Sequence, residues 1–153
     1  LAVLAATSTD RAIRRLGKRW RRLHRLVYPI ALLAIVHYFL QSKLDVTEPV
    51  LMAGLLVWMF GYRLVARAGK PGAARLIGLA VGAALITAGI ETGWYAFGTG
   101  ADPLRVLAAH LDVAFGLRPA LWVAIVTLGV AAAALGRKAL DRWPLPLRLR
   151  AAG

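Results

Sequence analysis

The chain has 153 residues, of which 59% are hydrophobic and only 18% are charged, yet its formal net charge is +13. About a quarter of the residues in a soluble domain are charged, and the cations here stand in blocks between long apolar runs. This pattern predicts an integral membrane protein in contact with anionic lipid and argues against nucleic acid as a partner. The chain contains no cysteine, which excludes disulfides, iron–sulfur clusters, thiolate haem ligation and cysteine-based zinc sites.

The N-terminal quarter of the chain changes from apolar to polar and then to strongly basic. Residues 1–6 resemble the inner end of a membrane span, so we expect the chain to be the C-terminal part of a longer protein. Residues 7–10 are good helix N-cap residues. Residues 11–25 hold eight Lys or Arg, and four apolar side chains recur among them at helical spacing: Ile13, Leu16, Trp20 and Leu23.

The basic run predicts one amphipathic helix that lies on the membrane surface with its apolar side down and Trp20 at headgroup level. A solvated basic loop is the alternative. The run has two interpretations as well. In the first, which we favour, its basic side chains are the anchor that fixes the topology. In the second, they bind the phosphate of a flavin, since arginine binds phosphate through paired donors, or the headgroup region near a quinol.

Four apolar runs predict complete membrane spans, at residues 26–40, 50–65, 76–97 and 119–135. Pro29 removes the backbone hydrogen bond to the Arg25 carbonyl and predicts a kink near the start of the first span. Pro49 is well placed as the first helical residue of the second span. A short interfacial helix is expected at residues 103–115. The predicted fold is therefore an all-α, polytopic helical bundle, with four complete spans plus the end of a preceding one.

Two smaller features belong to the second half of the chain. The third span contains the small-residue pairs Gly78-x-x-x-Gly82 and Gly89-x-x-x-Gly93, which predict close helix packing, although the abundance of glycine weakens this signal. Residues 143–146 (WPLP) are expected to end regular structure after the last span.

The distribution of the cations predicts the topology. Residues 7–25, 63–75 and 137–150 hold eight, four and five Lys or Arg, which is 17 of the 20 in the chain. The other side of the membrane has three: Lys43, Arg105 and Arg118. The positive-inside rule therefore places residues 7–25, 63–75 and 137–153 in the cytoplasm. The turn at 43–49 and the segment 98–118 then face outward, which is the periplasm if the membrane is a bacterial inner membrane.

Two of the three histidines, His24 and His37, bracket the first span. They lie roughly 20 Å apart along a helix and point about 140° apart if that helix is straight. They cannot share one metal ion, but each could serve a site near one face of the membrane. Imidazole is a common axial ligand of haem iron. Alternatively, His24 is an interfacial histidine among cations, and His37 is hydrogen-bonded to a neighbouring carbonyl.

Two further ionisable residues are candidate functional groups. His110 lies in the external amphipathic segment, where an exposed or interfacial histidine is the expected role. Glu91 could relay protons, but it is near the outer end of the third span, where a carboxylate costs less. We therefore assign neither of them a function from the sequence.

A family resemblance is carried by five motifs in order: Thr7-Ser8-Thr9-Asp10, Arg14-Arg15-Leu16-Gly17-x-Arg19-Trp20, Leu23-His24-Arg25-Leu26-Val27-Tyr28, His37-Tyr38 and Asp45-x-x-Glu48-Pro49. These residues resemble the MsrQ family, the haem-binding membrane subunits of bacterial periplasmic methionine-sulfoxide reductase systems, within the ferric-reductase-like transmembrane proteins. The resemblance covers residues 1–67, expected to be the C-terminal part of that haem-binding domain. Residues 68–153 are expected to be an extension with two further transmembrane helices.

The resemblance implies haem b, with His24 and His37 as axial ligands of the iron. It also implies a further haem histidine on an earlier helix, so we expect this chain alone not to complete a bis-histidine site. Pro29 stands where the family usually has an ordinary apolar residue. Quinol from the quinone pool, or FMN on the cytoplasmic side, would supply electrons. A periplasmic molybdopterin-containing reductase would receive them and repair oxidised proteins, so no catalytic residue is expected here.

Three alternatives remain open at this point. A ferric-reductase or oxidase-like enzyme would reduce its own substrate, but it needs a flavin and nicotinamide domain; none follows the last span here, which counts against this alternative unless the domain is encoded separately. A non-redox membrane scaffold or transporter-like bundle would bind no haem. Finally, the extension after residue 68 could have its own partner or quinone site.

Overall fold

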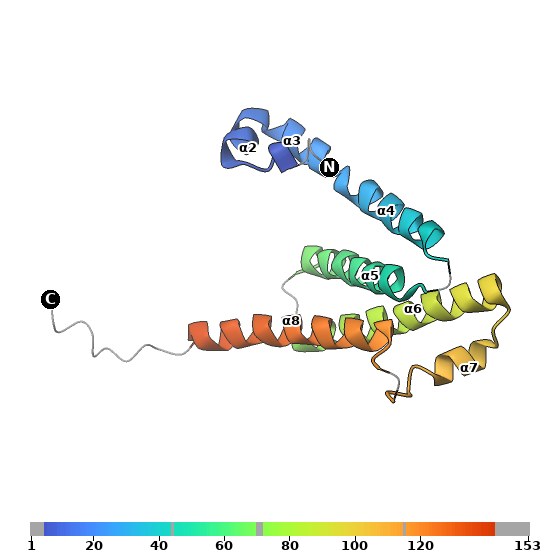
Figure 1. The fold of residues 1–153 in the computed structure, drawn as a ribbon. Coiled ribbons are helices and arrows are strands. Elements are labelled where there is room, and N and C mark those ends of the chain that lie inside the picture. Colours follow the sequence, from blue (N-terminus) through green and yellow to red (C-terminus); the bar gives the residue numbers. More distant parts are fainter. Residues whose placement is uncertain (1–4, 44, 70–71, 115, 143–153) are drawn as a thin grey trace. The chain divides into compact units, whose positions relative to one another are not determined.

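The computed structural model describes residues 5–43, 45–69, 72–114 and 116–142, and these residues form helices and connecting turns without a strand (Figure 1). The helices are α2 (Asp10–Leu16), α3 (Lys18–His24), α4 (Val27–Gln41), α5 (Thr47–Arg67), α6 (Ala73–Thr99), α7 (Pro103–Ala108) and α8 (Pro119–Arg142). The all-α prediction is confirmed. Most of the proposed preceding span, residues 1–4, and the predicted stop at residues 143–146 lie outside the described residues.

Four helical stretches are long and apolar enough to cross a membrane: Lys18–Gln41, Thr47–Arg67, Ala73–Thr99 and Pro119–Arg137. Each contains one of the four predicted spans; the first stretch begins at Lys18 instead of residue 26, and the other three extend the predicted spans by two to five residues. Because a membrane-spanning helix needs about 20 residues, the observed lengths of 19 to 27 residues suit a bilayer. The chain is a multi-pass membrane protein.

The chain divides into two compact units, residues 1–49 and residues 50–153. The boundary falls within the first turn of α5. The division suggested by the family resemblance, after residue 67, concerns sequence likeness and stays a prediction.

In the unit 1–49, the basic run forms two helices where one was predicted. Gly17 separates α2 from α3 with φ of +49° and ψ of −120°, a conformation that glycine adopts far more readily than any residue with a Cβ. Its N–H donates to the Ile13 carbonyl at 3.0 Å and ends α2. The prediction of a single helix was therefore wrong, because hydrophobic spacing does not reveal a left-handed residue inside the pattern.

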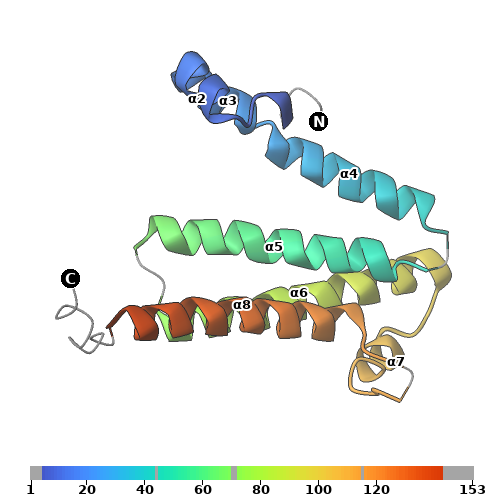
Figure 2. The ribbon, with the colours of Figure 1, turned by 60° about the vertical axis from the view of Figure 1, so that its left-hand side comes forward.

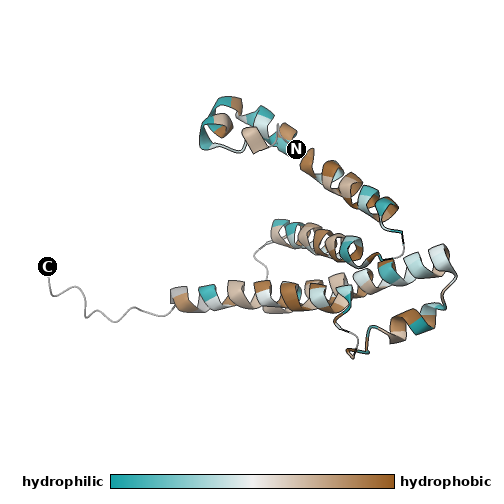
Figure 3. Cartoon of the chain, in the orientation of Figure 1, coloured by the Kyte–Doolittle hydropathy of each residue, from teal (hydrophilic) through white to brown (hydrophobic). Residues whose placement is uncertain are grey.

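The amphipathic character of this segment is nevertheless confirmed. The four apolar side chains of the predicted stripe are each half-buried, and all eight Lys and Arg of residues 11–25 are exposed. Figure 3 shows the hydrophilic colour concentrated on α2 and α3 and the hydrophobic colour on α4. The predicted N-cap is also present, since Thr9 Oγ1 accepts a hydrogen bond from the Ala12 N–H at 3.3 Å.

The expected distortion at Pro29 is found between α3 and α4. α3 ends at His24 and α4 begins at Val27. Since Pro29 has no N–H, the Arg25 carbonyl is free of its usual partner and instead accepts from the Tyr28 N–H at 3.3 Å. The regular helical hydrogen bonding is therefore interrupted between His24 and Val27, although Arg25 and Leu26 keep right-handed helical dihedral angles.

In the unit 50–153, α6 and α8 pack along each other, as both Figure 1 and Figure 2 show. Apart from Leu76, these buried side chains of the two helices are small or β-branched: Ala80, Ala83 and Thr87 of α6, and Ala120, Val123, Thr127 and Ala131 of α8. The threonine hydroxyls donate to carbonyls one turn earlier, Ala83 and Val123, both at 2.6 Å. This pairing lets two polar side chains lie in an apolar interface.

The glycine prediction for α6 was wrong. A Cβ added at Gly78, Gly82, Gly89 or Gly93 would meet nothing within 4 Å. The close approaches occur on α5, where a Cβ at Gly54 would lie 2.2 Å from Thr87 Oγ1, and one at Gly61 would lie 2.3 Å from Leu79 Cδ1. Spacing alone could not identify the packed glycines, because it does not say which helix face has a neighbour.

The short helix predicted at residues 103–115 is shorter than expected. α7 ends at Ala108, and residues 109–111 continue as turns. Asp102 caps the helix, since its Oδ1 accepts from the Leu104 N–H at 2.9 Å. α7 packs on α6, which brings the residues that follow α7 close to the outer end of that helix.

Candidate functional site

His24 lies at the end of α3, and both of its ring nitrogens have partners. Nδ1 is 3.3 Å from the Trp20 carbonyl, and Nε2 is 3.3 Å from Ser8 Oγ. Because a carbonyl can only accept, Nδ1 carries the hydrogen and Nε2 presents its lone pair. The ring also stacks on Trp20, with centroids 4.1 Å apart. A second partner on one nitrogen is the usual way in which a metal-binding histidine is oriented.

The surroundings of His24 are built by the polar break that precedes α2. Trp20 Nε1 donates to the Thr7 carbonyl at 2.7 Å, which holds residues 7 and 8 against α3. The hydroxyl of Ser8 thereby reaches Nε2 of His24. The first and third motifs of the family resemblance are thus in direct contact around one imidazole.

His37 lies in the middle of the outer half of α4 and is exposed. Its Nε2 is 3.5 Å from Gln41 Nε2, one turn further along the same helix. No residue of α4 is buried, so the imidazole projects from an apolar helix. An imidazole in hydrocarbon is costly and is usually used for binding or catalysis.

Next to His37, two other motifs of the resemblance also meet. Tyr38 Oη donates a hydrogen bond to Glu48 Oε2, which ties the end of α4 to the first turn of α5. Asp45 Oδ1 accepts from the Thr47 N–H at 2.9 Å and stabilises the turn between these helices. The pKa of Asp45 is lowered below its usual value, mainly by a hydrogen bond from the Thr47 side chain and secondly by the one from the Thr47 backbone.

The two histidines remain separate candidate ligands. The residues that the structure describes contain no group of three or more His, Cys, Asp or Glu able to hold a metal ion. A haem differs from such a metal site because its four porphyrin nitrogens already bind the iron, so each protein site supplies one or two axial ligands. His24 and His37 fit this donor set, each with Nε2 available on exchange of one weak hydrogen bond.

A hollow of about 380 Å³ lies beside the N-terminal turn of α2. Its lining includes Arg11 and Arg15, which are one helical turn apart, together with Thr9 and Leu16. Two guanidinium groups at this spacing can bind an anion in pairs of hydrogen bonds.

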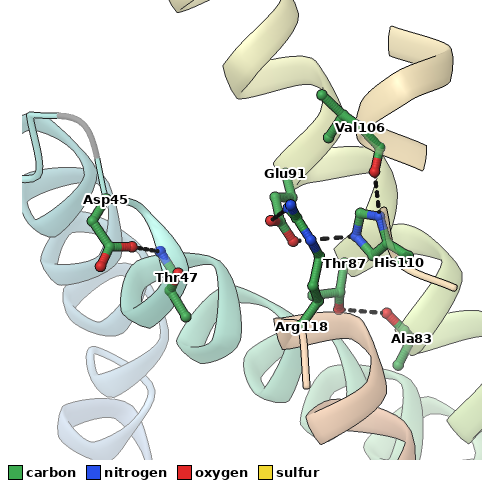
Figure 4. Close-up of polar contacts among 8 residues, drawn as sticks. All are labelled: Asp45, Thr47, Ala83, Thr87, Glu91, Val106, His110 and Arg118. Atoms are coloured by element: carbon green, nitrogen blue, oxygen red, sulfur yellow. Dashed lines mark hydrogen bonds and ion pairs between the residues drawn. The ribbon is translucent and has the colours of Figure 1, made fainter. Parts of the chain in front are cut away.

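A second polar cluster joins three residues that the sequence did not link: Glu91, His110 and Arg118 (Figure 4). Arg118 Nη1 is 2.6 Å from Glu91 Oε1, and His110 Nε2 is 3.1 Å from Glu91 Oε2. His110 Nδ1 lies 2.9 Å from the Val106 carbonyl. The expectation that His110 is exposed or interfacial was wrong, because only 8% of its side chain is accessible.

Sequence reasoning missed this cluster, although one signal was available. Glu91 is the one acid in α6, and His110 and Arg118 are basic groups in the segment that follows its outer end. A carboxylate that folding buries must be paired. The pairing of this acid with the cations of the next loop could therefore have been expected.

Comparison with known proteins gives a partial match. The chain is 53% identical over 66 residues to the protein-methionine-sulfoxide reductase heme-binding subunit MsrQ of Rhodospirillum rubrum, which is 42% of this chain and 32% of that protein. It is 48% identical over 77 residues to MsrQ of Bordetella pertussis, 49% of this chain and 37% of that protein. The chain is also 48% identical over 64 residues to MsrQ of Xanthomonas campestris, which is 42% of this chain and 29% of that protein.

The resemblance to MsrQ is confirmed over up to about half of this chain, and the chain spans about a third of the length of these relatives. No family model matches the chain, and no solved structure matches it.

Proposed function

We propose that the chain is part of a membrane electron-transfer subunit that binds haem b and serves a protein-methionine-sulfoxide reductase. The observation that carries this proposal is the identity of 48–53% to MsrQ subunits from three genera. Such similarity within an apolar membrane segment is hard to attribute to composition, because it includes polar motifs in a fixed order. When bound, haem would supply a reversible one-electron carrier inside the membrane.

In this proposal His24 is the axial ligand near the cytoplasmic face. The Nδ1 hydrogen bond to the Trp20 carbonyl and the stacked Trp20 ring support it, because both fix the plane of the imidazole and direct Nε2 away from its own helix. The Ser8 hydroxyl is the group that the iron would replace. The energetic cost of that exchange is small, since a hydrogen bond of 3.3 Å is long for a hydroxyl.

His37 is the proposed axial ligand near the outer face. Its exposure on α4, a helix without buried residues, supports this role, because ligation would compensate the cost of placing an imidazole in the apolar region. The two sites would lie roughly 20 Å apart along the chain direction. His24 and His37 would thus hold haem near the two faces of the membrane, and haem bound there would supply the one-electron chemistry.

The donor and acceptor follow from the proposed orientation in a bacterial inner membrane. Residues 7–25, 63–75 and 137–153 would face the cytoplasm, and the turn at 43–49 and segment 98–118 would face the periplasm. Electrons would come from the quinone pool or from FMN, whose phosphate would suit the hollow beside Arg11 and Arg15. A molybdopterin-containing reductase in the periplasm would receive the electrons and carry out the catalysis. Residues 68–153 would be an extension that follows the haem-binding domain.

A dithionite-reduced minus air-oxidised visible spectrum tests the haem proposal. The sample would be membranes containing this chain and, in parallel, the chain together with any coding sequence that precedes it in its gene. We expect α and Soret bands of low-spin b haem in at least one sample. The bands should disappear in His37→Ala and be reduced or shifted in His24→Ala.

The matched control is Leu40→Ala, which truncates another exposed side chain of the same helix, 76% accessible and one turn from His37. It should retain the bands at an equal amount of protein. Haem absent from both samples, or bands that survive His37→Ala unchanged, would contradict the assignment. The chain would then be better described as a membrane scaffold without a redox role.

A further inference from the structure

The cluster of Glu91, His110 and Arg118 is not used by the proposed electron transfer. We propose that it is a proton-binding site, in which one proton held between His110 Nε2 and Glu91 Oε2 fastens segment 100–118 to the outer end of α6. The inference rests on the geometry of the unit 50–153 alone and does not depend on haem.

The hydrogen bond at Nδ1 fixes what the other ring nitrogen must do. Nδ1 is 2.9 Å from the Val106 carbonyl, and a carbonyl only accepts, so Nδ1 carries a hydrogen. In a neutral imidazole, Nε2 then has a lone pair and no hydrogen. That lone pair would face a carboxylate oxygen, also an acceptor, at 3.1 Å.

Burial makes this contact untenable without a proton. Only 8% of the His110 side chain and 3% of the Glu91 side chain are accessible, so water does not separate them. Neither Nε2 nor Oε2 makes a hydrogen bond with the described residues, so the 3.1 Å between them is an ion-pair contact and not a hydrogen bond. Two buried acceptors that face each other repel, and each also loses its hydrogen bonds to water. One proton between them turns the repulsion into a charge-assisted contact.

Arg118 decides which of the two groups carries the proton. Its Nη1 lies 2.6 Å from Glu91 Oε1, and a guanidinium at this distance favours the ionised carboxylate. The proton therefore belongs on His110, and the cluster consists of one anion between two cations. Arg118 is 34% accessible, so the cluster has one edge towards water through which protons can exchange.

Other charged groups near the cluster leave this balance unchanged. On α7, Arg105 is 89% accessible and lies 3.8 Å from Asp102. After α7, Asp112 Oδ1 accepts from the Ala114 N–H at 3.0 Å. Besides Glu91, α6 offers only the weak acid Tyr95 near its outer end, and α8 has no ionisable residue before Arg137.

The three residues come from different parts of the chain, so binding or loss of the proton changes how these parts are held together. Glu91 belongs to α6, His110 follows α7, and Arg118 directly precedes α8. With the proton bound, the segment between α6 and α8 is held at both His110 and Arg118. Without it, the His110 contact becomes repulsive while the Arg118 contact remains, so the middle of the segment is released.

The test is ¹⁵N NMR of the full chain labelled with [¹⁵N]histidine in lipid nanodiscs at pH 7.5, where free imidazole is mostly neutral. Assignment uses His110→Ala. We expect His110 to show both ring nitrogens protonated. In Glu91→Gln, the amide NH₂ can donate to Nε2 while its oxygen accepts from Arg118, so His110 should become a neutral imidazole protonated only at Nδ1.

An unchanged helical content by circular dichroism would show that Glu91→Gln is folded, because most of the helical residues belong to the unit 50–153. If that variant does not fold, a pH titration of the unmodified chain replaces it, and hydrogen exchange of residues 104–113 should accelerate as His110 loses its Nε2 proton. A neutral His110 at pH 7.5 in the unmodified chain would overturn the proposal. Hydrogen exchange that is independent of the His110 titration would overturn the fastening role.

Discussion

Gly54 of α5 lies directly against the α6–α8 pair, and its replacement by alanine tests how tightly the unit 50–153 is packed. The added Cβ would lie 2.2 Å from Thr87 Oγ1 and 2.7 Å from Val123 Cγ2. Both neighbours are fully buried, and β-branched side chains have few rotamers in a helix. The Thr87 hydroxyl is also bonded to the Ala83 carbonyl. Since neither side chain can move aside, α5 must shift outward.

The size of the effect follows from two opposing contributions. Over-packing of a well-packed interior costs about 1–3 kcal/mol, whereas alanine is favoured over glycine in a helix by about 1 kcal/mol. Gly54→Ala should therefore destabilise the protein by up to about 2 kcal/mol, and by about 1–3 kcal/mol relative to an alanine that meets no neighbour. The Cβ of Gly61→Ala would meet the side chain of Leu79, whose closest atom is the flexible terminal Cδ1, and that of Gly82→Ala would meet none of the described residues within 4 Å, so both substitutions should be neutral or stabilising.

Unfolding of the full chain in mixed micelles, followed by circular dichroism, measures this order. A double-mutant cycle with Thr87→Ala adds a control, because that change removes two of the three contacts that the new Cβ would make. The two substitutions should then be less destabilising together than the sum of their separate effects. Equal stability of Gly54→Ala and Gly82→Ala, or additive effects in the cycle, would refute the packing described for α5.

Three further predictions concern the turns and the topology. Gly17→Ala should cost roughly 1–3 kcal/mol, because φ of +49° with ψ of −120° strains any residue with a Cβ, and hydrogen exchange in α2 should accelerate; unchanged exchange would contradict the strain. Thr47→Val should raise the pKa of Asp45 towards its usual value, because the Thr47 side chain is the first cause of the lowering; ¹³C NMR titration measures this. Since the folded-state pKa is the lowered one, the contribution to stability is complete above the usual pKa of about 3.9 and is lost as pH falls through the folded-state value. Finally, because the chain has no cysteine, single cysteines report topology directly: Ala101→Cys should react with an impermeant maleimide from outside, and Ala68→Cys only after permeabilisation, whereas the reverse pattern would contradict the proposed orientation.

The sequence was sufficient to predict the long helices, for a simple physical reason. A span needs only a long apolar run, and α5, α6 and α8 each follow such a run from one polar boundary to the next. The interruption at Pro29 was also predictable, because a missing N–H is a property of the residue itself and needs no tertiary neighbour.

Features that depend on neighbours could not be predicted in the same way. Gly17 stands within a regular amphipathic pattern, and only its backbone conformation divides the helix. The glycines of α6 have the spacing of a packing motif but face no neighbour, whereas Gly54 of α5 has no such motif and is tightly packed. Helix packing is decided by which faces meet, and that information is distributed over the whole chain.

The candidate sites show the same division. His24 and His37 were identified from their positions in an apolar run and from the family resemblance, and their role as ligands stays a prediction. His110 and Glu91 were each judged separately to be interfacial. The structure instead places them in one buried cluster with Arg118, which follows Glu91 by 27 residues.

The most direct test of the proposed electron transfer follows the oxidation of reduced haem in membranes containing the chain with any preceding coding sequence. Haem reduced anaerobically by a quinol should stay reduced with ferric citrate. It should be reoxidised when a periplasmic molybdopterin-containing reductase and a protein containing methionine sulfoxide are added together. Reoxidation by ferric citrate alone would instead indicate an enzyme that reduces its own substrate. Haem that stays reduced in the presence of the reductase and the oxidised protein would contradict the proposed role.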